Sequence, residues 1–378
     1  MSFLSSSSTR LRSDAWYHKL TLVPWSFVLL LFALGFLGVM ALYSAGGGFS
    51  PWAAQHLVRL VFGMCVMIGV AMVDIRIWYR MALPLYLFGI AQLIFVDTFG
   101  KIGGGARSWI NLGIMNFQPS EFMKIVLVLL LARIYHDMPY EKLRKLRSLV
   151  MPLIVIAVPT LLVAVQPDLG TASKMAVAGV AVIFVAGPPL WVFVTGTCVA
   201  LGTLPILWSQ LYDYQKRRVF TFLDPESDPF GAGFHITQSK IALGSGGFWG
   251  KGYLEGTQSR LNFLPEKHTD FIFTLWAEEW GWIGGTFIIF LYYLVFVASL
   301  WYAFRCRHTF GKLLSFGVAI NLGLYVMINI GMVMGLLPVV GVPLPFMSHG
   351  GTAILTNLFG FGLLLSTVVY RDSKLPTH

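Results

Sequence analysis

Ten apolar runs follow one another along this chain and leave little sequence outside them. A helix needs about 20 apolar residues to cross the hydrocarbon core of a bilayer. Only 12% of the 378 residues are charged and 56% are hydrophobic, whereas soluble domains carry about 25% charged residues. The mean hydropathy of +0.72 agrees with this composition. The runs cover residues 22–45, 54–73, 78–97, 119–135, 149–165, 171–187, 189–208, 270–303, 313–336 and 346–370.

The pattern predicts an all-α, polytopic integral membrane protein with about ten transmembrane helices, because helices satisfy their own backbone hydrogen bonds inside lipid. We expect a single membrane domain over residues 1–378. The runs at 149–165, 171–187 and 189–208 are short and closely spaced. A groove open to lipid could lie between them.

The distribution of lysine and arginine predicts that both termini lie in the cytoplasm. Fifteen of these cations fall on the side of the N-terminus, which holds the tail at 1–21, the basic loop at 137–148 and the tail at 371–378. The outer loop at 98–118 holds only Lys101 and Arg107. The large outer loop at 209–269 holds seven, but long loops translocate largely regardless of charge. The net charge of +10 therefore indicates the cell inner membrane and no nucleic-acid partner.

The loop at 209–269 is too long for a simple connector between the seventh and eighth helices, and loops of that length are usually functional or disordered. Its aromatic and leucine content favours order. Lys240, Gln258 and Arg260 would suit a sugar or pyrophosphate surface, and would equally suit a solvated loop face. The glycine-rich stretch at 244–252 is by itself a weak phosphate-binding signal.

Asp270 is the first candidate for chemistry. The run from 270 to 303 has 34 residues, or about 51 Å of helix, which exceeds the roughly 30 Å hydrocarbon core. The uncharged stretch 282–301 can cross alone, so residues 270–281 should lie at the outer interface or line a polar cavity. Asp270 would then lie at a helix N-terminus, where either a catalytic role or a helix-capping role is open.

Other ionisable residues at membrane depth favour structural roles over catalytic ones, although placing charges there is costly. Adjacent Glu278 and Glu279 should pair inside the protein with cations from other spans. Glu121 and Lys124 are three residues apart, so they can form an ion pair on one helix face, or Lys124 could bind an anionic headgroup. The segment at 166–171 predicts a tight turn that begins a helix. No His or Cys group has metal-site spacing.

Four segments together resemble the SEDS family of cell-wall proteins, and the resemblance runs from the first span to the last. Within the family, the stretch 223–233 and the short N-terminal tail are similar to the RodA-type elongation branch rather than to the FtsW-type division branch. The four segments are Phe117-Gln118-Pro119-Ser120-Glu121, Gln166-Pro167-Asp168-Leu169-Gly170-Thr171, 264–273 around Asp270, and 337–345.

The resemblance implies a SEDS fold and a peptidoglycan glycosyltransferase that polymerises lipid II on the outer face of the membrane during cell elongation and rod-shape maintenance. It implies a class B penicillin-binding protein and other elongation-complex membrane proteins as partners. The family's essential aspartate falls on Asp270, its outer-loop tryptophan on Trp109, and its paired Glu and Lys on Glu121 and Lys124. His268 lies in the same segment as Asp270 and is a further substrate-binding candidate.

This chain departs from the family pattern in two places, with Ser108 where a second arginine is common and His349 where a tyrosine is usual. Those departures leave any role of a second cation or a tyrosine hydroxyl there in doubt.

The implied reaction is an inverting transfer, for which Asp270 is the expected general base. Arg107, Lys124, Lys240 and Arg260 are the expected cations for the pyrophosphate leaving group. A divalent cation (Mg²⁺ or Mn²⁺) could assist, but no ligand set is visible. Two alternatives stay open, a lipid II flippase, which ten spans with buried charges also suit, and a scaffold that only activates the penicillin-binding protein.

Overall fold

A computed structural model describes residues 16–103, 106–111, 113, 116–143, 145–228, 231–260 and 266–376. Within them, ten helices correspond to the ten apolar runs. These are α3 (Trp25–Gly46), α4 (Trp52–Met72), α5 (Ile75–Phe99), α6 (Pro119–Asp137), α8 (Arg147–Val165), α9 (Leu169–Ala186), α10 (Leu190–Gln210), α14 (Ile272–Arg305), α15 (Thr309–Val333) and α16 (Gly351–Val369).

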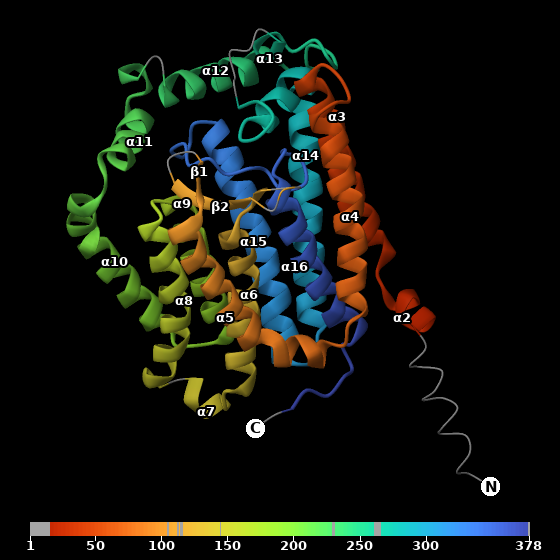
Figure 1. The fold of residues 1–378 in the computed structure, drawn as a ribbon, viewed down its shortest axis with the longest axis vertical. Coiled ribbons are helices and arrows are strands. Elements are labelled where there is room, and N and C mark those ends of the chain that lie inside the picture. Colours follow the sequence, from red (N-terminus) through yellow and green to blue (C-terminus); the bar gives the residue numbers. More distant parts are fainter. Residues whose placement is uncertain are drawn as a thin grey trace.

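Eight of these ten helices are long and apolar enough to cross a membrane. The other two are α6, which carries Glu121, Lys124 and Arg133, and α10, whose apolar part ends at Ile206. The prediction of an all-α polytopic membrane protein is confirmed. Short helices α2 (Trp16–Leu22) and α7 (Tyr140–Leu143) lie at the same end of the bundle as the C-terminal residues (Figure 1).

The predicted outer loop at 98–118 contains three strands that were not predicted from the sequence. β1 (Lys101–Gly103), β2 (Ala106–Asn111) and β3 (Asn116–Phe117) form a three-stranded antiparallel sheet in the order β1-β2-β3. Trp109 pairs with Lys101, and Ile110 pairs with Phe117. Aromatic and β-branched residues at these positions favour strands, but strands this short leave almost no periodic signal.

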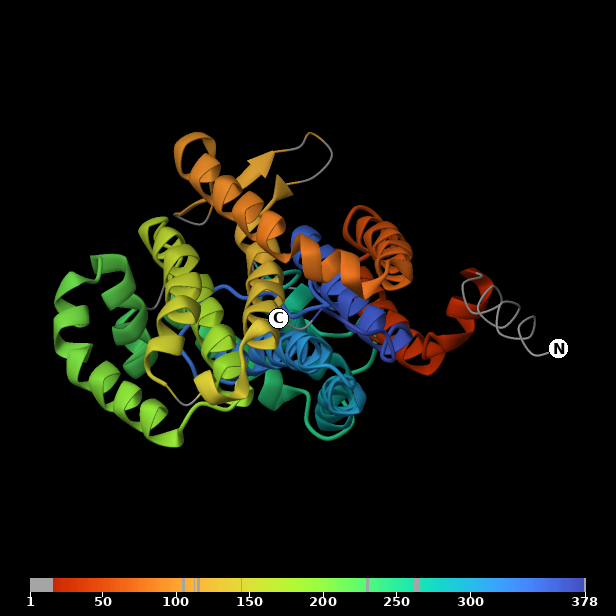
Figure 2. The same cartoon turned by 90° about the horizontal axis from the view of Figure 1, so that it is seen from below.

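The bundle is organised around α6 and α16, whose side chains are buried on nearly every face. α6 packs against α5, α9, α15 and α16, and α16 packs against α4 (Figure 2). A helix that is apolar all round is typical of such a central position. The few polar residues of α6 therefore face other helices and not lipid.

The segment between α10 and α14 is largely helical. It contains α11 (Asp213–Leu223), the 3₁₀ turn η1 (Pro225–Ser227), α12 (Ala232–Ser245) and α13 (Thr257–Arg260), which lie at the end of the bundle opposite α7 (Figure 1). α10 stands at the periphery in both views, and its described side chains are mostly exposed. The seventh span is therefore the one held least by its neighbours.

α14 is divided at Gly281, where the backbone leaves helical geometry with φ 65° and ψ −161°. The part before the break, Ile272 to Glu279, is buried in protein, and its position at the outer interface or along a polar cavity stays a prediction. The glycine-rich stretch docks its backbone on this break. Trp282 N donates to Gly247 O at 2.9 Å, and Gly252 N donates to Glu279 O at 3.0 Å.

We expect Gly281→Ala to lower the free energy of unfolding by about 1–3 kcal/mol, since almost only glycine adopts these dihedral angles. An added Cβ would also lie 2.3 Å from Gly250 N. Thermal unfolding in detergent measures the effect. Gly285→Ala on the same helix is the control, because its Cβ would meet Phe273 Cζ at an ordinary 3.5 Å. Equal melting temperatures for the two variants would contradict the argument.

Candidate active site

Asp270 lies in the turn immediately before α14 and is partly buried. The N-cap of α14 is Phe271, and no side chain caps this helix. The carboxylate of Asp270 makes no hydrogen bond to any other residue in the described ranges. Asp270 therefore does not cap α14, and the helix-capping alternative is wrong. The carboxylate remains available to a ligand.

The backbone around Asp270 is held by other segments. Asn329 of α15 donates from Nδ2 to Asp270 O at 2.8 Å and to Val342 O at 2.6 Å. Ser348 Oγ donates to Thr269 O at 2.6 Å, and His349 N donates to His268 O at 2.8 Å. These bonds fix the position of the carboxylate relative to α15 and to the segment before α16.

The four segments that carry the family resemblance meet at this place. Gly341 approaches the carboxylate so closely that a Cβ there would lie 3.4 Å from Asp270 Oδ2. Gly170 packs on Val340, where a Cβ would lie 2.1 Å from Val340 Cγ1. Gln118 Nε2 donates to Asp168 Oδ2 at 3.5 Å. The described parts of these segments, at 117–121, 166–171, 266–273 and 337–345, thus form one connected structure.

Burial raises the pKa of Asp270 to about 6, and the negative charge of Glu266 acts in the same direction. Lys174 of α9 and Arg218 of α11 oppose the rise because they favour the ionised carboxylate. A carboxylate with this pKa can accept a proton near neutral pH. The two neighbouring cations could stabilise negative charge that develops on a ligand.

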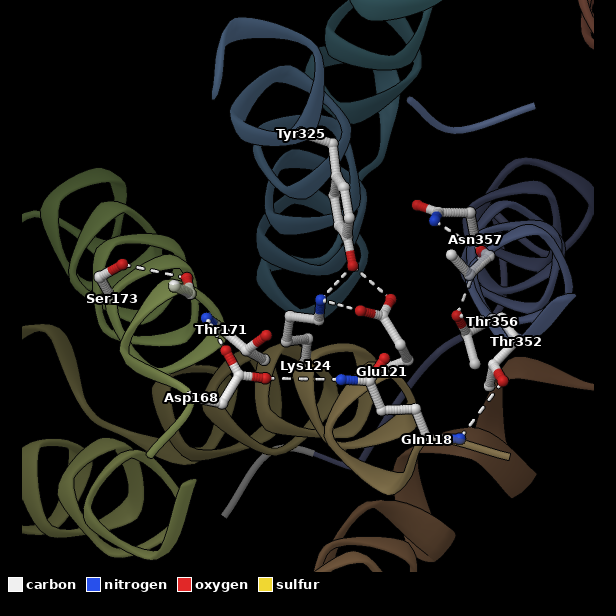
Figure 3. Close-up of polar contacts among 12 residues, drawn as sticks. Gln118, Glu121, Lys124, Asp168, Thr171, Ser173, Tyr325, Thr352, Thr356 and Asn357 are labelled. Atoms are coloured by element: carbon white, nitrogen blue, oxygen red, sulfur yellow. Dashed lines mark hydrogen bonds and ion pairs between the residues drawn. The ribbon is translucent and has the colours of Figure 1, made fainter. Parts of the chain in front are cut away.

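A buried polar cluster joins α6 and α15 inside the bundle (Figure 3). Lys124 Nζ donates to Glu121 Oε1 at 2.7 Å, and the hydroxyl of Tyr325 hydrogen-bonds both residues. Lys124 and Lys174 both lie over the Tyr325 ring, at 4.3 and 4.4 Å from its centroid. Two lysines therefore lie against the ring whose hydroxyl contacts Glu121.

Polar contacts at the start of α6 and α9 connect this cluster to the sheet and to α16 (Figure 3). Asp168 caps α9 by accepting from Thr171 N at 3.0 Å, as the predicted turn requires. Gln118 N donates to Thr352 Oγ1 at 3.2 Å, and Thr352 Oγ1 donates to Asn116 O at 2.8 Å. The β-strands are therefore anchored to the helices that hold Glu121 and Thr352.

The structure brings Asp270, Glu121 and Lys124 of the predicted site into one region. His268, two residues before Asp270, stacks on Trp52 with ring centroids 4.2 Å apart. Trp109 is partly buried in β2. Arg107 lies in β2 and Arg260 in α13, but their side chains lie outside what the structure describes.

Two predicted binding residues make their contacts elsewhere. Lys240 is exposed on α12 and lies against the turn at Gly335, where a Cβ would be 2.1 Å from Lys240 Cε. The backbone N of Gln258 donates to Glu278 Oε1 at 3.0 Å. The structure does not bring either one to the Asp270 carboxylate.

Glu278 and Glu279 are buried, and their partners differ from the predicted cations of other spans. Lys251 Nζ lies 2.7 Å from Glu278 Oε1, and Ser44 Oγ donates to Glu279 Oε1. The cation that pairs with Glu278 comes from the glycine-rich stretch and not from another span.

Four residues near Asp270 were not predicted from the sequence, namely Lys174, Arg218, Tyr325 and Asn329. Lys174 was assigned to a structural turn, although a lysine inside a span is a functional candidate by default. Arg218 follows Lys216 and Arg217 in the long loop, and nothing in the sequence distinguishes it from these two neighbouring cations. Tyr325 and Asn329 are four residues apart on α15, and polar residues at that spacing share one helix face. This spacing was a signal that could have found them.

Among the described residues, no group of three His, Cys, Asp or Glu side chains could hold a metal ion. Asp270 and Glu266 are the carboxylates whose charges act on each other near the site. A Mg²⁺ ion is commonly held by one or two carboxylates together with substrate phosphates. The donor set thus suits an ion that substrate helps to bind.

A family model described as a cell cycle protein, for FtsW, RodA and SpoVE, matches residues 21–373. The chain is 43% identical over 357 residues to the peptidoglycan glycosyltransferase MrdB of Escherichia coli strain K12, which covers 94% of this chain and 95% of MrdB. It is 31% identical over 417 residues to the peptidoglycan glycosyltransferase RodA of Treponema pallidum, with 90% of this chain and 96% of that protein covered.

A solved structure has the same fold. A chain from a peptidoglycan synthase complex that coordinates polymerization and crosslinking superposes with a TM-score of 0.81 at 30% identity. The match covers 93% of this chain and 99% of the other. The similarity therefore extends over the whole bundle, including the region of Asp270.

Proposed function

The chain belongs to the FtsW, RodA and SpoVE family, also called SEDS, and from this premise we propose that it is a peptidoglycan glycosyltransferase acting in cell elongation and rod-shape maintenance. It polymerises lipid II into β-1,4-linked glycan strands. The observation that carries this proposal is the Asp270 carboxylate, which is partly buried, has no hydrogen bond to the residues that the structure describes, and is accompanied by Lys174 and Arg218.

In the proposed mechanism, Asp270 accepts the proton of the 4-hydroxyl on the acceptor N-acetylglucosamine. That oxygen attacks C1 of the donor N-acetylmuramic acid, and undecaprenyl pyrophosphate leaves with inversion at C1. Pyrophosphate leaves as an anion, so it needs cations rather than a proton donor. Lys174 and Arg218 are the cations whose fields reach Asp270, and Lys124 lies with Lys174 over the Tyr325 ring.

We propose that the Asp270 end of the bundle faces the outside of the cell inner membrane and that both termini are cytoplasmic. The end that holds α2, α7 and the C-terminal residues lies opposite α11, α12 and α13. The excess of lysine and arginine at the end that holds α2 and α7 supports this orientation. Lipid-anchored substrates would then reach the site from the outer leaflet.

The proposed partner is a class B penicillin-binding protein, with other elongation-complex membrane proteins. The support is that the solved relative belongs to a complex that coordinates polymerization and crosslinking. A divalent cation is proposed as an auxiliary that the phosphates of the substrate would chiefly hold, since the described residues offer no group of three ligands. Such an ion would supply positive charge to the substrate pyrophosphate.

Purified protein, lipid II and the partner test the function directly. A polymerase produces glycan strands that can be resolved on a gel. The flippase alternative has support from the charges buried between spans, such as Glu121, Lys124 and Lys174. A flippase would move labelled lipid II across proteoliposomes and make no polymer. A scaffold would bind the partner with neither activity, so the two assays separate the three functions.

The pH dependence of polymerisation follows from the raised pKa of Asp270. A general base works only when ionised, so the rate should be constant above pH 7 and should fall through a midpoint near the pKa of about 6. Below the midpoint we expect a loss of about tenfold per pH unit. The ratio kcat/KM, from initial rates at subsaturating lipid II between pH 5 and 8, measures this limb for the ligand-free site. A rate that rises as the pH falls would assign Asp270 an acid role instead.

A further inference from the structure

A pocket lies at the end of the bundle opposite Asp270, between the last turn of α14, the beginning of α3 and the end of α16. Its volume is about 210 Å³, and no acidic residue lines it. The lining residues are Pro24, Trp301, Tyr302, Arg305, Cys306, Val368 and Arg371.

The aromatic residues place this pocket at a membrane interface. Trp301 is 47% exposed at the end of α14, and Trp25 is 45% exposed at the beginning of α3. Tryptophan is enriched where the hydrocarbon core meets the headgroups. Phe304, beside the pocket on α14, is 78% exposed and presents an apolar surface that acyl chains could cover.

Arg305 is held with its guanidinium free for a ligand. Its Cζ lies 3.9 Å from the centroid of the Trp301 ring, and no ion pair or hydrogen bond joins it to another residue that the structure describes. Stacking on an aromatic face leaves the N–H edge of a guanidinium available to bind phosphate in a bidentate manner.

The remaining charges around the pocket are also mostly positive. Asp372 lies 3.0 Å from Arg307 and 3.5 Å from Arg371, so two arginines share this one exposed carboxylate. Lys19 of α2 lies over the ring of Tyr370, the residue before Arg371. The helix-terminal positions alone explain cations here, but not an aromatic-lined cavity between them.

We propose that this pocket binds the phosphate headgroup of an anionic phospholipid, with Arg305 and Arg371 on the phosphate and Trp301 at the glycerol level. Basic pockets between transmembrane helices on the cytoplasmic side are typical sites for such headgroups. With Asp270 facing outward, as proposed above, the lipid belongs to the inner leaflet. The site is separate from the glycosyl transfer, so it stands or falls independently of that activity.

Native mass spectrometry of the full-length protein in detergent, titrated with phosphatidylglycerol or phosphatidylcholine, tests the proposal. We expect phosphatidylglycerol to be retained preferentially and its binding to weaken with salt. Arg305→Gln should weaken the retention about fivefold, the factor that one cation contributes near an anionic surface. Arg371→Gln should act in the same direction, and it decides the matter if the first variant does not fold.

Arg307→Gln is the matched control. Arg307 follows Arg305 by two residues. Its side chain is 79% exposed and does not line the pocket. Equal loss in the Arg307 and Arg305 variants, or equal retention of phosphatidylcholine, would overturn the proposal. Displacement of the lipid by an equal concentration of inorganic phosphate would also overturn it, because the pocket would then take a soluble anion.

Discussion

Asp270→Asn is expected to lower the rate of lipid II polymerisation by about 10²- to 10⁴-fold, the usual contribution of a positioned general base. Asparagine has nearly the same shape as aspartate but cannot accept the proton of the attacking hydroxyl. The backbone bond from Asn329 to residue 270 does not involve the carboxylate, so the turn before α14 should keep its position. Glycan strands formed in the presence of the partner measure the rate.

Stability measurements separate this loss from misfolding. The pKa of Asp270 is raised to about 6 from its ordinary 3.8, so the ionised carboxylate destabilises the folded state above pH 4. That cost begins to shrink as the pH falls below about 6, where the folded state takes up the proton, and it is gone below about pH 4, where the unfolded state is protonated as well. The asparagine variant should therefore melt at the same temperature as the wild type, or slightly higher, at pH 7.5.

Glu266→Gln is the control for the chemistry. Glu266 is exposed, and its charge contributes to the raised pKa of Asp270. Its removal should preserve polymerisation and move the acid limb of the pH profile to lower pH. If the glutamine variant lost as much activity as Asp270→Asn, or if Asp270→Asn polymerised at the wild-type rate, Asp270 would not be the base.

The spans and the residues that can be charged within them were predictable from the sequence, because hydropathy and the cost of intramembrane charge are local properties. The sheet at 101–117 was not predictable, since its strands are two to six residues long. The kink at Gly281 also left no signal in hydropathy, because the apolar run continues through it.

The arrangement of the site depends on which helices pack together, and no local pattern contains that information. Lys174 and Tyr325 come from α9 and α15, and they meet because these two helices pack against each other and against α6. Lys240 and Gln258 have suitable chemistry for binding sugar or phosphate, yet α12 and α13 direct their contacts to Gly335 and Glu278. Residue type predicted which side chains could act, and packing decides which of them lie near Asp270.

The largest expected loss of stability follows from Lys124→Met. Lys124 is 1% exposed, and it pairs with Glu121 at 2.7 Å inside the bundle. Methionine fills similar space but leaves the buried carboxylate of Glu121 without its nearest cation. Removal of one partner of a buried pair costs about 3–5 kcal/mol. Lys174 shares the Tyr325 ring and offsets part of this cost, so the lower end of that range is expected.

The double variant Glu121→Gln with Lys124→Met distinguishes this cause from a general packing defect. Removing both charges leaves no unpaired ion, and replacing a buried pair by neutral groups is often nearly neutral for stability. The double variant should therefore recover much of the stability lost by Lys124→Met. Unfolding in detergent, induced by heat or by added denaturant, measures the stability of the single and the double variant.

Arg133→Met is the matched control on the same helix. Arg133 pairs with Asp137 at 3.8 Å, but both side chains are 29% exposed. Exposed pairs contribute about 0–1 kcal/mol, so this substitution should change the free energy of unfolding far less than Lys124→Met. Equal destabilisation by the two variants would mean that burial does not govern the strength of the pair, and the role assigned to the Glu121, Lys124 and Tyr325 cluster would have to be abandoned.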